Sequence, residues 1–131
     1  VHRVLTELYS NTPAGLPGND DGGVLSSWVV FAQLGLYPEI SGVGGLAVGS
    51  PTFPHAVIHL PEGASICIDA SQTAPGDFYV QSMRIGGRDY GSPWIPWSAL
   101  AHGAKIEFEL GGTSNKTWGI QPDAMPSFDV K

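Results

Sequence analysis

Hydrophobic positions along this chain follow two different periods. In the first third they recur at helical spacing, beginning with Val1, Val4, Leu5 and Leu8. From about residue 46 they tend instead to alternate with polar positions, and glycines at positions 42, 44 and 45 separate the two parts. The pattern therefore predicts an α+β fold whose helices precede its strands.

Two helices are predicted in the first part. One covers the first eight residues and has no capping residue before it, so we expect its beginning to be missing. The other begins at Asp21 or Gly22 and ends at Leu36, because the residue before Pro38 avoids the helical conformation. Apolar side chains surround nearly its whole circumference, which is typical of a buried helix. These side chains belong to Val24, Leu25, Trp28, Val29, Val30, Phe31, Ala32, Leu34 and Leu36.

The second part is predicted to form antiparallel strands packed as a small β-sandwich. Strands at 56–60 and 65–70 flank a short hairpin connection, and a strand at 78–85 runs into a Gly-Gly turn. The clearest strand covers 105–110, where one face carries Ile106, Phe108 and Leu110 and the other carries Lys105, Glu107 and Glu109. A helical turn is expected at 97–102. We accordingly divide the chain into residues 1–45, 46–119 and a tail at 120–131.

Composition and charge narrow the function classes. Glycine and proline are abundant and charged residues are few, which describes a turn-rich globular domain rather than a disordered segment. The net charge is −6 with few basic residues, so nucleic acid and anionic membranes are not expected partners. Cys67 is the single cysteine, which excludes an intrachain disulfide. The sequence shows neither a signal peptide nor a long apolar span, but a fragment would have lost a leader.

Two adjacent carboxylates are the strongest candidates for chemistry. Asp20 and Asp21 lie between a glycine-rich loop and the start of the second helix. The unpaired N–H groups and positive dipole end of a helix N-terminus keep such a carboxylate ionised and positioned. One of them can therefore act as a base, or it can simply cap the helix, and the segment alone leaves both roles open.

Other polar and aromatic residues are weaker candidates. His2, His55, His59 and His102 lack the spacing of metal ligands. Trp94 and Trp97 can stack on a sugar or pack in the core, and packing is the expected role. Glu107 and Glu109 share one solvated strand face, which argues against a catalytic pair. Ser26 and Ser27 are expected to be small packing residues.

Several motifs recur together in one order. They are Gly15-Leu-Pro-Gly-Asn-Asp-Asp-Gly-Gly, Ser27-Trp28, Val30-Phe31, Leu34-Gly35-Leu36-Tyr37-Pro38 and Gly49-Ser50-Pro51 with Phe53. From about residue 3 to about residue 118, the chain resembles the C-terminal end of family 92 glycoside hydrolases, which are calcium-dependent, inverting exo-α-mannosidases. The resemblance implies that the two helices end an (α/α)6 barrel and that a small β-sandwich follows. The family's catalytic unit is several times longer, so we expect this chain to be a fragment.

The resemblance also assigns roles within the acidic segment. It makes Asp21 the general base that activates water, with Asp20 and Asn19 assisting. Many family members carry an aspartate where this chain has Asn19, although an amide can also hold a water. The general acid and most calcium ligands are implied to lie upstream, so the isolated chain is expected to be inactive.

Further expectations concern cofactor, partners and location. The resemblance implies calcium as cofactor in the full-length enzyme and α-mannoside glycans as substrates. It also implies the rest of the catalytic barrel as a partner and a secreted or periplasmic location in bacteria. An apolar helix without its barrel predicts self-association through a patch around Val24, Trp28 and Phe31.

A competing hypothesis belongs to another functional class. The chain would be a stand-alone carbohydrate-binding or structural β-sandwich module whose acidic loop only caps a helix. This reading requires Trp94, Trp97 or Trp118 to be exposed on one face, where a sugar ring can stack.

Overall fold

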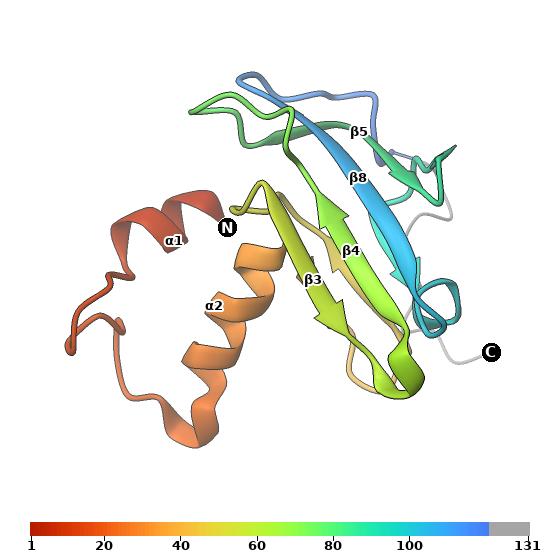
Figure 1. The fold of residues 1–131 in the computed structure, drawn as a ribbon. Coiled ribbons are helices and arrows are strands. Elements are labelled where there is room, and N and C mark those ends of the chain that lie inside the picture. The colour runs from red at the N-terminus through yellow and green to blue at the C-terminus, as the bar shows by residue number, and fades with distance from the viewer. Residues whose placement is uncertain (121–131) are drawn as a thin grey trace.

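The computed structural model describes residues 1–120, and the predicted tail lies almost entirely outside them. The chain folds into two helices followed by two small sheets (Figure 1). In chain order, the elements are α1 (His2–Glu7), η1 (Asp21–Gly23), α2 (Val24–Leu34), β1 (Leu36–Tyr37), β2 (Gly45–Val48), β3 (His55–His59), η2 (Pro61–Gly63), β4 (Ser65–Asp69), β5 (Tyr79–Ile85), β6 (Arg88–Asp89), β7 (Trp94–Pro96), η3 (Trp97–Ala99) and β8 (Ala104–Gly111). The predicted α+β fold is confirmed.

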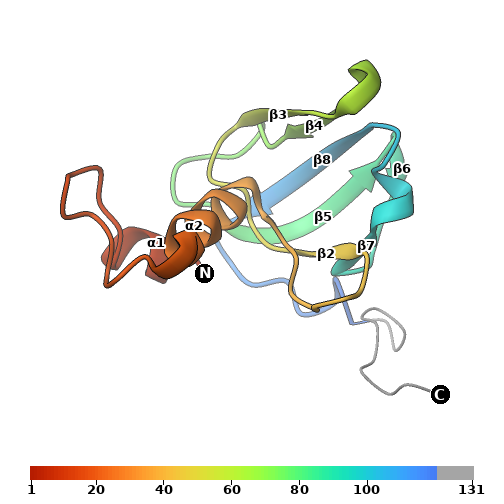
Figure 2. The ribbon, with the colours of Figure 1, turned by 90° about the horizontal axis from the view of Figure 1, so that it is seen from below.

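Two sheets form the sandwich. The larger has the order β3-β4-β8-β5-β6, and the smaller has the order β1-β2-β7. Figure 2 shows β2 and β7 lying across the face of β5, with both helices at one side of the sheets. The hairpins predicted between β3 and β4 and between β5 and β6 are present. The pairing of β4 with β8 is parallel, because the chain passes through β5, β6 and β7 before β8 returns beside β4.

The hydrophobic core lies between the two sheets. The alternation predicted for β8 is confirmed, since Ile106, Phe108 and Leu110 are all buried. Ile68 of β4 and Ile95 of β7 are fully enclosed and belong to the same cluster. Burial of these side chains provides the main stabilisation of the sandwich, because each removes a large apolar area from water.

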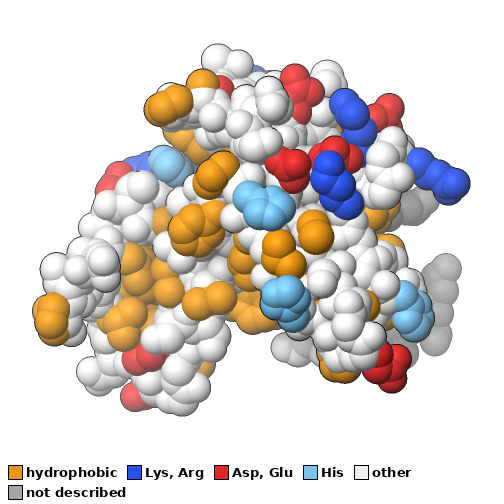
Figure 3. All heavy atoms as spheres, in the orientation of Figure 1, with side chains coloured by type: hydrophobic (Ala, Val, Ile, Leu, Met, Phe, Trp, Pro, Cys, Tyr) orange, Lys and Arg blue, Asp and Glu red, His pale blue; other side chains and the backbone are white. Residues whose placement is uncertain are grey.

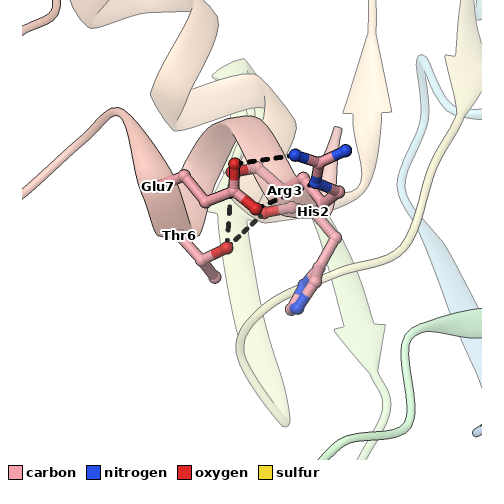
Figure 4. A network of polar contacts seen from close by, with 4 residues as sticks. All are labelled: His2, Arg3, Thr6 and Glu7. Carbon is pink, nitrogen blue, oxygen red and sulfur yellow. Dashed lines mark hydrogen bonds and ion pairs between the residues drawn. The ribbon is translucent and has the colours of Figure 1, made fainter.

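The first helix, α1, is short and exposed. Its side chains interact along one face, where the Arg3 guanidinium binds the Glu7 carboxylate at 2.8 and 3.1 Å (Figure 4). The Thr6 hydroxyl donates to the backbone carbonyls of His2 and Arg3 at 3.1 and 3.3 Å. Such exposed pairs stabilise a helix only slightly, so packing matters more. Tyr9, just beyond α1, stacks on Trp28 of α2 with ring centroids 5.6 Å apart.

The second helix, α2, differs from its predicted bounds. It begins at Val24, because Gly22 and Gly23 take left-handed conformations, and it ends at Leu34 before a left-handed Gly35. The amide of Gly35 returns to the Ala32 and Phe31 carbonyls, which closes the helix. The apolar pattern predicts a helix buried inside a complete barrel; in this chain only Ala32 is buried, and Val24 and Val30 are 64% and 55% exposed.

This exposure has a simple structural reason. Within the chain, α2 packs chiefly on α1 and β1, which cover only part of its apolar circumference. Figure 3 shows hydrophobic side chains gathered over the helices and beside β3, whereas charged side chains gather over the central strands. No helix among residues 1–120 is both long enough and apolar enough to cross a membrane. The domain division at residue 45 stays a prediction.

Candidate active site

A glycine pair shapes the acidic segment before α2. Gly22 and Gly23 have φ angles of 63° and 77°, which ordinary L-residues avoid. Their left-handed conformations form a tight turn, in which the Gly23 amide donates to the Asp20 carbonyl at 3.0 Å. This turn lies at the end of α2 that is remote from the sheets (Figure 1).

The Asp20 carboxylate is occupied by the first turn of α2. Its Oδ1 accepts the backbone N–H groups of Leu25 and Ser26 at 2.7 and 3.1 Å. Its Oδ2 accepts a short hydrogen bond from the Ser26 hydroxyl. The Ser26 hydroxyl, followed by the Ser26 and Leu25 amides, lowers the pKa of Asp20, while partial desolvation opposes this. Asp20 therefore caps the helix, although Gly23 is the residue that directly precedes it.

Asp21 has the opposite environment. Its side chain is exposed, and no donor among residues 1–120 forms a hydrogen bond or ion pair with its carboxylate. A carboxylate that is exposed and has no donor bound to it is free to accept a proton from water. Asn19, on the other side of Asp20, is also exposed. The sequence left open whether these aspartates cap the helix or act as a base. In the structure Asp20 caps the helix, and the Asp21 carboxylate is free of such contacts within residues 1–120.

Tyr9 ties the long loop before the acidic segment to α2. Its hydroxyl donates to the Leu25 carbonyl at 3.4 Å, and its ring stacks on Trp28. At the base of the loop, the Ser10 amide donates to the Gly15 carbonyl at 3.0 Å. These contacts hold α1 and the start of α2 together, so the acidic segment is attached to a supported helix end.

The other predicted candidates do not join this segment. His55 and His59 are exposed on β3, and the His2 ring stacks on Phe78 with centroids 4.1 Å apart. His102 is exposed in the turn before β8. Within residues 1–120 no group of three His, Cys, Asp or Glu side chains is arranged to hold a metal ion.

The glutamates of β8 have partners of their own. Glu107 accepts from the Lys105 ammonium at 2.8 Å, and Glu109 accepts from the Ser82 hydroxyl at 2.8 Å. Lys105 also lies 3.7 Å from Asp69 of β4. This charged face therefore forms a network of surface pairs along the sheet.

The tryptophans do not form a common sugar-stacking face. Trp94 is only 7% exposed and lies in β7, and its ring packs directly over Gly45. The Trp118 indole N–H donates to the Tyr90 carbonyl at 3.3 Å from a half-buried position. Trp97 is 44% exposed. Core packing, the role expected for Trp94, is confirmed. Trp94 is therefore not available to stack on a sugar, as the hypothesis of a stand-alone module would need.

A separate cleft of about 680 Å³ lies between the start of α1 and the loops at 49–54 and 70–79. His2, Phe53, Phe78 and Tyr79 contribute to its walls. A second depression of about 500 Å³ lies over the charged face of β8. The acidic segment contributes to neither of them and stands on an open surface of this chain.

The chain is similar to known proteins in both its sequence and its fold. The model of the glycosyl hydrolase family 92 catalytic domain matches residues 1–112. An uncharacterized secreted glycosidase from Arthroderma benhamiae is 29% identical, and the match covers 97% of this chain and 17% of that protein.

Solved structures that are similar to this chain also belong to family GH92. A family GH92 α-mannosidase from Bacteroides thetaiotaomicron in complex with mannoimidazole superposes with a TM-score of 0.88 at 27% identity, covering 95% of this chain and 16% of that one. A family GH92 inverting mannosidase from the same organism gives a TM-score of 0.87 at 29% identity, covering 95% of this chain and 17% of that one. The chain thus spans about one sixth of the length of the relatives that it matches.

Proposed function

Since this chain belongs to glycosyl hydrolase family 92, we propose that it is the C-terminal part of an inverting exo-α-mannosidase and supplies its general base. Both similar Bacteroides structures are mannosidases, and one of them is described as inverting. The observation that carries the proposal is the contrast in the acidic segment. Asp20 is saturated by donors from α2, whereas Asp21 is exposed and unpaired within residues 1–120.

The proposed chemistry needs two carboxyl groups. In an inverting glycosidase, an acid protonates the departing oxygen while a base activates water on the opposite face, with the two groups about 6.5 to 9.5 Å apart. Asp21 takes the part of the base. Its carboxylate accepts a proton from water as the water oxygen attacks the anomeric carbon. We propose that Asn19 assists by orienting the same water through its side-chain amide, and that the general acid belongs to the rest of the enzyme.

Residues 1–120 do not form a calcium site by themselves. A calcium ion takes about six to eight oxygen ligands, and the described residues bring no three carboxylate, imidazole or thiol groups together. Both oxygens of Asp20 are already engaged by α2. We therefore propose that any calcium ligands of the full-length enzyme lie mostly in its other segments, and no catalytic step here is routed through the metal.

The remaining parts of the proposal concern substrate and location. The substrate class is α-mannoside glycans, and the partner of this segment is the rest of the catalytic barrel, which would cover the exposed side of α2. Export from the cell is supported by the fungal relative, which is described as secreted. A bacterial source stays a prediction. The 131-residue chain by itself is proposed to be inactive, because the resemblance implies that the general acid lies in the rest of the enzyme.

The test is mannose release by the full-length enzyme that contains this segment. Asp21→Asn keeps the size and polarity of the side chain but cannot accept the proton, so turnover of an α-mannoside should fall about 10²- to 10⁴-fold. Near wild-type turnover by this variant would show that the base has been wrongly assigned.

A further inference from the structure

The Ser26 hydroxyl makes a contact that neither helix formation nor the proposed base chemistry requires. The helix already gains a capped N-terminus from the two backbone N–H groups that reach Asp20. The hydroxyl adds a third donor on the other carboxylate oxygen. Consequently, both oxygens of Asp20 are held, and its side chain cannot rotate without losing a hydrogen bond.

Asp20 is also held through its backbone. Its carbonyl accepts the Gly23 amide at 3.0 Å, across the left-handed Gly22. The backbone around Asp21 is therefore held on both sides, at Asp20 before it and at Gly23, the start of the helix, after it. Two adjacent glycines would otherwise allow this backbone a wide range of conformations.

From this geometry, we infer that Ser26 is a positioning residue, which acts through Asp20 to fix where the Asp21 carboxylate stands. The inference rests on the proposed function, since it concerns the placement of the proposed base. A catalytic group has to be held within about 0.5 Å of its productive position. A displacement of about 1 Å can cost about 10²-fold in rate, so the hydroxyl matters even though it touches no substrate.

The chain supplies a matched control next to this serine. Ser27 is exposed, and its hydroxyl makes no hydrogen bond among residues 1–120. Removing either hydroxyl has the same small effect on intrinsic helix propensity, because both substitutions replace serine by alanine in the first turn of α2. Only Ser26 contacts Asp20.

The experiment compares variants in the full-length enzyme on an α-mannoside. Ser26→Ala should lower kcat about 10- to 100-fold with little change in KM, the range typical of losing a group that orients a catalytic residue. Ser26→Thr keeps the hydroxyl and should recover most of that loss, and Ser27→Ala should match wild type. The folded fraction of each variant is measured by thermal unfolding, and kcat is expressed per folded enzyme.

A second variant covers the case in which Ser26→Ala folds poorly. In Asp20→Asn, the remaining carbonyl oxygen can still cap the helix, but the side-chain amide can only donate to the Ser26 oxygen, so a hydrogen bond to a charged carboxylate becomes a weaker neutral one. It should therefore lower kcat in the same direction as Ser26→Ala, by a smaller factor. Wild-type kcat in folded Ser26→Ala or in Asp20→Asn overturns the inference, and so does a Ser26→Thr variant as slow as Ser26→Ala.

Asp21→Asn, run alongside, separates the two proposals. If Asp21→Asn is inactive while Ser26→Ala retains wild-type kcat, the positioning role is wrong and the base assignment survives. If Asp21→Asn is fully active, the base assignment is wrong, and the positioning role is overturned with it.

Discussion

The glycine at position 22 offers a sharp test of how the acidic segment is built. Its φ of 63° and ψ of 15° lie in the left-handed region, where a Cβ crowds the following carbonyl. A Cβ added there meets no atom within 4 Å, so steric contact with the rest of the chain adds nothing. The cost of Gly22→Ala is thus the backbone term alone, about 1 to 2 kcal/mol of unfolding free energy. Gly22→Asn should cost less, because asparagine tolerates this conformation.

Urea unfolding of the 131-residue chain measures these differences. Gly91→Ala is the matched control, because Gly91 also has open space around its Cα but no positive φ. That substitution should be neutral or stabilising by up to about 1 kcal/mol, since alanine restricts the unfolded chain. Equal stability of Gly22→Ala and Gly91→Ala would refute the left-handed turn and with it the separation of Asp20 from Asp21.

Four further outcomes are expected. Ile106→Ala, at a fully buried position of β8, should lower the unfolding free energy by about 2 to 5 kcal/mol in urea titrations. Val57→Ala, at an exposed position, should change it by less than about 0.5 kcal/mol. Asp20 caps α2 in its ionised form, so its contribution to stability should be complete above its unfolded-state pKa of about 3.9 and be lost as pH falls through its lower folded-state pKa. The unfolding free energy should therefore decrease less on acidification in Asp20→Asn than in wild type. Calorimetric titration of the chain with calcium should show no micromolar binding, and saturable one-to-one binding would mean that the ligand shell has been misplaced. The exposed apolar side of α2 should make the chain self-associate in light scattering and bind a hydrophobic dye, and a strict dye-free monomer at high concentration would count against this.

The strands were predictable because their signals are local. Alternation placed Ile106, Phe108 and Leu110 on the buried face of β8, and the Gly86-Gly87 turn marked the hairpin between β5 and β6. The parallel pairing of β4 with β8 was not predicted, because the two strands are joined by three intervening strands and their register depends on the whole sheet. Local alternation carries no information about which distant strand becomes a neighbour.

The sequence indicated the acidic segment as a candidate site, and the resemblance assigned Asp21 as its base, but which aspartate caps the helix was left open. Spacing alone suggests that either aspartate can reach the helix, and only the left-handed turn at Gly22 and Gly23 directs Asp20 toward Leu25 and Ser26. The same turn explains why α2 starts later than its apolar pattern predicts. Ser26 was expected to be a packing residue. A serine two positions into a helix that follows an acidic loop is the signal that would have indicated its contact with a carboxylate.

The most direct test of the account is the turnover of Asp21→Asn in the full-length enzyme, measured as mannose released from an α-mannoside. The account predicts a kcat about 10²- to 10⁴-fold below wild type, with the variant folded and its KM nearly unchanged. A folded Asp21→Asn enzyme with wild-type kcat would contradict the assignment of this segment as the source of the general base.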